Sequence, residues 1–122
     1  MTISAKPIAL VVEDEPLIRM LAMDASLEEG FEVLEAEHAA EALRIHGSAA
    51  MVHVLFTDVN MPGELNGIEL AEQLKARTPA LHIIITSALP ILRPVDHLPA
   101  TFVVKPYDPA SVSKTAMAFL AA

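Results

Sequence analysis

The stretch "LFTDVNMPG", Leu55 to Gly63, ends an apolar run in the carboxylate of Asp58 and then breaks into a loop. An uninterrupted apolar run of this length, bounded by turn residues, predicts a strand that is buried on both faces. Pro62 and Gly63 mark the loop that follows. Asp58 therefore stands at the carboxyl end of a strand, where it serves either as a helix cap or as a chemical group.

Outward from this stretch, apolar runs alternate with helical patterns along the chain. The order predicts a parallel sheet of five strands, doubly wound, with helices on both faces. Pro16 opens the first helix and Gly30 closes it. Strands are expected at 8–12, 31–36, 52–58, 81–87 and 101–104, and the other helices at 39–47, 67–77 and 108–121, with 31–36 at an edge of the sheet.

Composition narrows the class of protein. A chain of 122 residues fits one domain, and an apolar content of 53% is that of a folded protein. The absence of cysteine excludes disulfides and thiol catalysis, and a net charge of −8 argues against direct binding of nucleic acid. No apolar stretch has the length of a membrane span or the form of a secretory signal, so we expect a cytoplasmic protein.

The predicted strands deliver polar residues to one edge of the sheet, because open parallel sheets bind ligands beyond the carboxyl ends of their strands. Carboxylates gathered there repel one another, and a divalent cation removes that cost. Ligation by oxygen alone favours Mg²⁺, and the five histidines show no metal-ligand spacing. A cation, an amine and a hydroxyl around one carboxylate are suited to phosphoryl transfer. The residues are Glu13, Asp14, Asp58, Thr86, Ser87 and Lys105.

Four motifs, "VVEDEP", "DVNMPG", "IIITSA" and "FVVKPY", follow one another at the ends of predicted strands. In this order the chain resembles, over nearly its whole length, the receiver domain of two-component response regulators. The resemblance implies a flavodoxin-like fold with strand order 2-1-3-4-5. It also implies a bacterial phosphorelay protein, with residues 1–122 as a single receiver domain and no output domain.

The resemblance assigns roles to the residues of the predicted site. Asp58 corresponds to the phosphoacceptor, which receives a phosphoryl group from a sensor histidine kinase or a histidine phosphotransfer protein. Glu13, Asp14 and Asp58, with the backbone carbonyl of Asn60, correspond to the Mg²⁺ ligands. Lys105 corresponds to the lysine that pairs with the phosphoryl group.

Further positions correspond to the family's switch. Thr86 matches the hydroxyl residue that moves to the phosphoryl oxygen, and Phe102 matches the aromatic residue that turns inward with it. The Lys105–Pro106 bond resembles the family's cis peptide. Phosphorylation then changes binding to a downstream protein target, with no catalysis beyond phosphorylation and dephosphorylation of Asp58 itself.

The family's fourth helix is expected to be short or irregular here, because Pro90, Pro94 and Pro99 disfavour a regular helix in residues 88–100. With prolines in this region, the chain resembles single-domain receivers that are frequent in alphaproteobacteria. Our hypothesis is that this segment is itself a recognition or switching element.

Other classes of protein stay open on the residues alone. Asp58 could cap a helix, and Glu13 and Asp14 could stabilise a helix N-terminus. A haloacid-dehalogenase-type phosphatase needs an acid two residues after its nucleophile, where this chain has Asn60. A flavodoxin-like flavin carrier needs a phosphate-binding loop after the first strand, which is missing. A receiver-like interaction module that works without phosphorylation is the remaining alternative.

Overall fold

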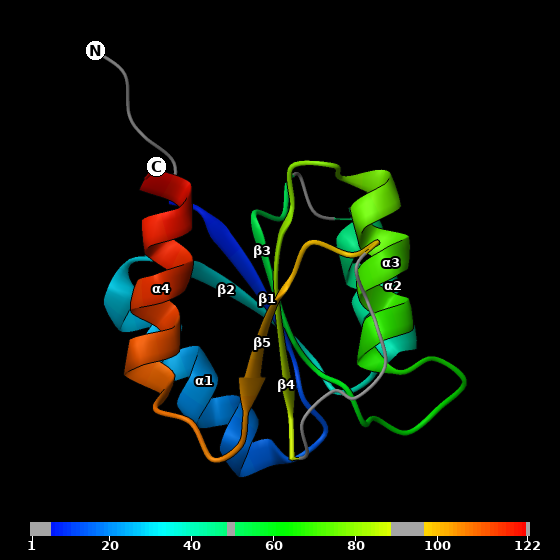
Figure 1. The fold of residues 1–122 in the computed structure, drawn as a ribbon, viewed down its shortest axis with the longest axis horizontal. Helices are drawn as coiled ribbons and strands as arrows, with labels where there is room; N and C mark the ends of the chain where they lie inside the picture. The colour runs from blue at the N-terminus through cyan, green and yellow to red at the C-terminus, as the bar shows by residue number, and fades with distance from the viewer. Residues whose placement is uncertain (1–5, 49–50, 89–96, 122) are drawn as a thin grey trace.

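The computed structural model describes residues 6–48, 51–88 and 97–121. They form a five-stranded parallel sheet in the order β2-β1-β3-β4-β5, with helices on both faces (Figure 1). The predicted flavodoxin-like, doubly wound fold is confirmed, with β2 at one edge. The strands are β1 (Ile8–Val12), β2 (Glu32–Ala36), β3 (Val54–Asp58), β4 (His82–Ser87) and β5 (Thr101–Val104), and the helices are α1 (Pro16–Glu29), α2 (Ala39–Ser48), α3 (Gly67–Arg77) and α4 (Pro109–Ala121).

Two apolar clusters, one on each face of the sheet, hold these layers together. Helices α1 and α4 cover one face, and α2 and α3 cover the other (Figure 1). Because successive side chains of a strand point to opposite faces, Leu10 and Val12 join the cluster under α2 and α3. Ala9 and Val11 join the cluster under α1 and α4. Burial on both faces explains why the central strands are continuous apolar runs.

Helix α1 carries apolar residues on more than one side. Leu17 and Leu21 follow helical spacing, yet their exposed fractions are 63% and 47%. The side that faces the protein instead buries Ala22 and Ser26. Ser26 Oγ donates to the Ala22 carbonyl at 2.8 Å and lies 3.3 Å from Ser113 Oγ on α4. These small residues let α1 and α4 pack closely. Leu17 and Leu21 lie on another side of α1 and face solvent.

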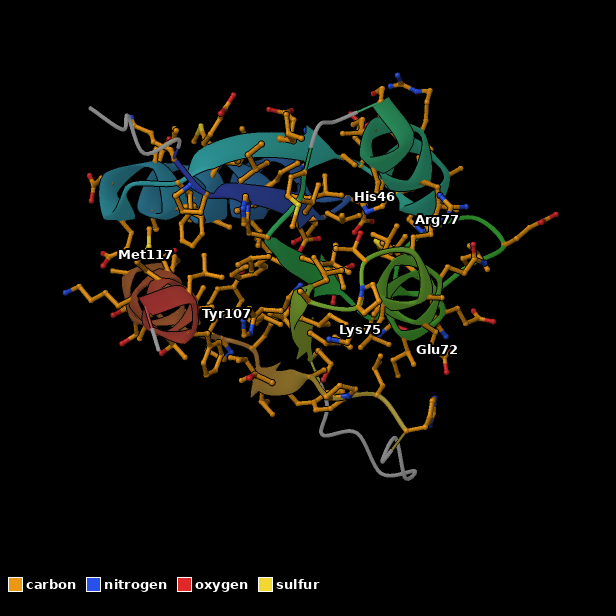
Figure 2. The ribbon with its side chains drawn as sticks, turned by 90° about the horizontal axis from the view of Figure 1, so that it is seen from above. His46, Glu72, Lys75, Arg77, Tyr107 and Met117 are labelled. Carbon is orange, nitrogen blue, oxygen red and sulfur yellow. The ribbon has the colours of Figure 1, made fainter. Side chains whose placement is uncertain are left out.

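The entry to β4 is tied to the ends of α2 and α3. Lys75 Nζ donates to the Leu81 carbonyl at 2.9 Å. His46 Nε2 lies 3.1 Å from Thr78 Oγ1. Figure 2 shows His46 on α2 beside Arg77 on α3. Burial, and then the positive charge of Arg77, lower the pKa of His46. These contacts fix where β4 begins, and therefore the position of Thr86 and Ser87 at its carboxyl end.

The stretch between β4 and β5 is described only at its two ends. Ala88 and residues 97–100 are not helical. Pro99 is exposed, and Leu98 is buried in the core under α2 and α3. The predicted short or irregular fourth helix falls mainly on residues 89–96, which lie outside the described residues. Among the helices of residues 6–48, 51–88 and 97–121, none has the length and apolar character needed to cross a membrane.

Candidate functional site

The polar residues expected at the carboxyl edge of the sheet come together there. Glu13 follows β1, Asp58 ends β3, Thr86 lies near the end of β4, and Lys105 follows β5. Asp58 and Thr86 face each other in the register of β3 and β4, and the Val59 N–H donates to the Thr86 carbonyl at 2.9 Å. Four strands therefore build one site.

Three acids form its centre. Glu13 and Asp58 are 4% and 7% exposed, whereas Asp14 is exposed. One carboxylate oxygen from each lies within 4.8 Å of the others, and within the described ranges this is the only such group of potential metal ligands. Buried carboxylates this close are costly unless a cation neutralises them. An all-oxygen set with one side open to water fits Mg²⁺, which retains several of its waters.

Lys105 supplies an ammonium group to the same cluster. Its Nζ lies 2.9 Å from Glu13 Oε1 and 3.2 Å from Asp58 Oδ2. Burial alone would lower the pKa of Lys105, but the hydrogen bond to Glu13 and the charge of Asp58 outweigh it and raise the pKa. Burial also raises the pKa of Glu13, helped by the charge of Asp58 and opposed by the hydrogen bond from Lys105. The lysine therefore stays charged between two carboxylates.

The loop after β3 leads into helix α3, whose N-terminal cap is a residue other than Asp58. Helix α3 begins at Gly67, and its cap is Asn66, whose Oδ1 accepts from the Glu69 N–H at 2.9 Å. The Glu69 side chain accepts from the Asn66 N–H in return, which completes a capping box. The Gly67 N–H donates to the Val59 carbonyl at 2.8 Å and folds the loop back onto β3. The helix-cap alternative for Asp58 is therefore wrong.

Two further predicted residues lie on the loop after β3 and on β5. Asn60 is exposed in the loop after Asp58. Phe102 is partly buried, lies opposite Ile85 in the register of β4 and β5, and packs against the core under α2 and α3. The Lys105–Pro106 bond is cis, as the resemblance implies.

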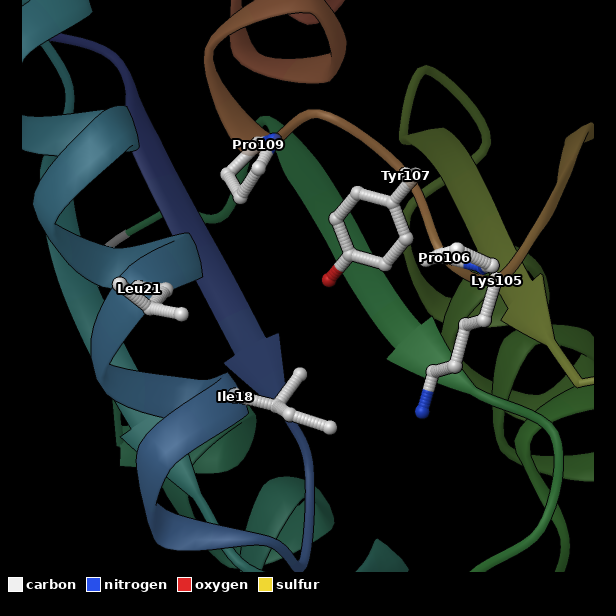
Figure 3. Close-up of a pocket in the computed structure, with 6 residues that line it drawn as sticks. All are labelled: Ile18, Leu21, Lys105, Pro106, Tyr107 and Pro109. Atoms are coloured by element: carbon white, nitrogen blue, oxygen red, sulfur yellow. The ribbon is translucent and has the colours of Figure 1, made fainter.

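A groove beside the acids is a feature that the sequence motifs do not reveal. It has a volume of about 330 Å³ and lies between α1 and the turn that follows β5 (Figure 3). Ile18 and Leu21 form one wall, and Tyr107 forms another. The full lining is Ile18, Leu21, Lys105, Pro106, Tyr107 and Pro109. The only signal in the sequence is that Tyr107 follows Lys105 and Pro106 directly.

Tyr107 connects this groove to the site. Its ring centroid lies 5.7 Å from that of Phe56. Burial, and then the negative charge of Glu13, raise the pKa of Tyr107 to about 12. Tyr107 is also the only tyrosine, and the chain has no tryptophan. Its ultraviolet absorbance and fluorescence therefore report on this position alone.

We expect the absorbance of native Tyr107 to titrate with a midpoint of about 12, against about 10 in the unfolded chain. The folded state holds the proton of the Tyr107 hydroxyl more tightly than the unfolded chain does. The contribution of this proton to the free energy of unfolding is therefore complete below about pH 10 and disappears as the pH rises through about 12. The free energy of unfolding of the wild type should therefore fall more between about pH 9 and pH 11 than that of Tyr107→Phe. A native-state midpoint near 10 would contradict this prediction.

Comparisons with known proteins agree with this geometry. A family model described as "Response regulator receiver domain" matches residues 9–116. Chemotaxis protein CheY1 of Helicobacter pylori is 41% identical over 68 residues, which cover 55% of this chain and 54% of that protein. The chain thus aligns with about half the length of this curated relative. Chemotaxis protein CheY of Thermotoga maritima is 29% identical over 108 residues, covering 84% of this chain and 88% of that protein.

Solved structures give the same picture. Response regulator protein TrrA from Thermotoga maritima, in complex with Mg²⁺-BeF, is 29% identical, with a TM-score of 0.79 over 92% of this chain and 97% of that one. A response regulator receiver protein from Sinorhizobium medicae has a TM-score of 0.84 over 96% of both chains, and at 20% identity it supports the fold alone. The fold is that of a receiver of two-component signalling. The chain belongs to the response regulator receiver domain family.

Proposed function

We propose that this chain is a phosphoacceptor receiver, in which Asp58 accepts a phosphoryl group from a sensor histidine kinase or a histidine phosphotransfer protein. The observation that carries the proposal is the position of Lys105 Nζ, 3.2 Å from Asp58 Oδ2, beside three clustered carboxylates. A nucleophile, a cation site and an ammonium group are thus within reach of one phosphoryl group. The TrrA structure, which contains Mg²⁺-BeF, supports the same metal here.

The transfer exchanges one bond for another. An Asp58 carboxylate oxygen attacks phosphorus, the phosphorus–nitrogen bond of the donor phosphohistidine breaks, and its electron pair returns to the imidazole. Glu13, Asp14, Asp58 and the Asn60 carbonyl would hold Mg²⁺, which would neutralise charge on the transferring group. Lys105 pairs with another phosphoryl oxygen. The receiver thus promotes its own phosphorylation and dephosphorylation and turns over no separate substrate.

Phosphorylation would then alter the surface of the last strand. The phosphoryl group adds about −1.5 to −2 charge, by analogy with phosphate esters, and it adds hydrogen-bond acceptors next to Thr86. Thr86 is buried directly opposite Asp58, so its hydroxyl is the donor best placed to respond. A shift of Thr86 makes room for Phe102 to turn inward, which changes the surface that a downstream protein target binds.

The proposal is tested by measuring intact mass after incubation with a small-molecule phosphodonor, with Mg²⁺ and with a chelator. We expect one phosphoryl adduct that forms with Mg²⁺ and falls to background with the chelator. A Mg²⁺ titration, read by Tyr107 fluorescence, is run in parallel. Binding of Mg²⁺ without an adduct indicates a need for the cognate protein donor. If the protein neither binds Mg²⁺ nor forms an adduct, the result favours the alternative, a receiver-like module that interacts without phosphorylation.

The surface next to the site suggests where a protein donor docks. Such a donor must contact the surface around Lys105 to bring its phosphohistidine to Asp58. Leu21 of α1 lines the groove of Figure 3, and both it and Leu17, one turn earlier on the same helix, are exposed. Exposed apolar side chains grouped around a groove are typical of protein interaction sites.

We expect Leu17→Gln combined with Leu21→Gln to slow phosphotransfer from a protein donor at least about tenfold. The reason is that two leucine side chains that the donor would bury become polar. Phosphorylation by a small-molecule donor should be unchanged, because Asp58 and Lys105 are intact. Leu27→Gln is the matched control, since Leu27 is 53% exposed on the same helix but about 9 Å further along it than Leu21. Equal slowing by both changes would count against this docking surface.

A further inference from the structure

Arg19 on α1 is held by three contacts next to the acidic cluster, although no motif of the sequence singles it out. Its side chain is only 12% exposed. Nη1 donates to the Glu13 carbonyl at 2.9 Å. Nε lies 3.5 Å from Glu35 Oε1, and Nη2 lies 3.8 Å from Glu37 Oε1. The guanidinium thus joins the turn after β1 to the end of β2.

Of these contacts, the bond to the Glu13 carbonyl matters most. The side chains of Glu35 and Glu37 are 53% and 63% exposed, and ion pairs with exposed partners contribute little. The Glu13 carbonyl belongs to the peptide unit that leads into Asp14. A charge-assisted hydrogen bond to that carbonyl therefore restricts how the two acids are oriented.

The other groups of Glu13 are also engaged. Its N–H donates to the Ala36 carbonyl at 3.1 Å. Its Oε2 accepts from the Glu15 N–H at 3.2 Å, and its Oε1 accepts from Lys105. Arg19 thus holds the backbone of a residue whose carboxylate is already aimed at the cation site.

We propose that Arg19 is a positioning residue that fixes the Glu13–Asp14 peptide unit for cation binding, an inference that rests on the proposed Mg²⁺ site. Without Arg19, this peptide unit gains freedom, and cation binding must order it again at a cost in free energy. A guanidinium is required because its planar fork reaches the carbonyl and Glu35 together, whereas a lysine ammonium is a single point of contact.

The sign of the effect separates this role from two others. Arg19 is a cation near a cation site, so a purely electrostatic role predicts tighter Mg²⁺ binding when its charge is removed. A purely structural role predicts a lower melting temperature with unchanged Mg²⁺ affinity. The positioning role alone predicts weaker Mg²⁺ binding although a positive charge has been lost.

The test is a Mg²⁺ titration of the wild type, Arg19→Met, Arg19→Lys and the control Arg44→Met, read by Tyr107 fluorescence. Arg44 is exposed on α2, and no hydrogen bond or ion pair of it is seen within the described residues, so its change removes the same charge elsewhere. We expect Arg19→Met to weaken Mg²⁺ binding about tenfold. Arg19→Lys should remain weaker than the wild type, and Arg44→Met should match the wild type.

Amide hydrogen exchange in metal-free protein gives a second readout. The Glu15 N–H, which is bonded to Glu13 Oε2, should exchange faster in Arg19→Met relative to core amides such as that of Leu55. Unchanged or tighter Mg²⁺ binding in Arg19→Met overturns the proposal, as does an unchanged Glu15 exchange rate. If the wild type binds no Mg²⁺, the proposed function fails by that result, and the Glu15 exchange rate still decides the positioning role of Arg19.

Discussion

Replacing Asp58 with asparagine is expected to abolish the phosphoryl adduct entirely. Asparagine keeps the shape of the side chain but removes the nucleophilic carboxylate. Of the two other acids in the cluster, Glu13 has both carboxylate oxygens engaged, by Lys105 and by the Glu15 N–H, and Asp14 is exposed. Intact mass after reaction with a small-molecule donor measures the result. A full adduct on Asp58→Asn would assign the acceptor to another residue.

The same change should also stabilise the metal-free protein. Three carboxylates within 4.8 Å repel one another, and Lys105 keeps its partner Glu13 after Asp58 loses its charge. We expect the free energy of unfolding to rise by about 1 kcal/mol, a gain typical when a strained functional site is relieved. Asp24→Asn is the control, since Asp24 is an exposed acid on α1. A loss of stability in Asp58→Asn would mean that the pair with Lys105 outweighs the repulsion.

Replacing Gly67 with alanine is expected to produce the largest structural effect. A Cβ at this position would lie 2.0 Å from the Asp58 carbonyl oxygen and 2.8 Å from its carbon. Both are backbone atoms, so no side chain can move aside. The first residue of α3 is thus packed directly on the peptide that carries the predicted phosphoacceptor, and its N–H donates to the Val59 carbonyl.

We expect Gly67→Ala to lower the free energy of unfolding by about 3 kcal/mol, the upper part of the usual range for overpacking. The displaced Asp58 should also be phosphorylated more slowly. Chemical denaturation measures the first effect, and the rate of adduct formation measures the second. Gly47→Ala is the matched control, because a Cβ there meets nothing within 4 Å and the residue lies in α2. That change should be neutral or stabilising by up to about 1 kcal/mol. Equal stability of the two variants would contradict the close approach at Gly67.

Much of the site could be predicted because it depends on strand order and strand ends. Apolar runs mark the strands, and the carboxyl ends of parallel strands share one edge of the sheet. Glu13, Asp58, Thr86 and Lys105 each stand at or near such an end, so local patterns were enough to bring them together. The same reasoning left Asp58 open as a helix cap, because a local pattern does not say which of several polar residues a later helix uses.

The amino-acid sequence by itself determined the sheet, its helices and the identity of the residues at its carboxyl edge, because these follow from local periodicity and topology. Only the tertiary structure decided that Leu17 and Leu21 face solvent, because spacing along α1 does not choose between two apolar stripes. It also decided that Arg19 reaches the Glu13 carbonyl and that Gly67 lies against Asp58. These are contacts between separate elements, and their distances are set by how whole helices pack on the sheet.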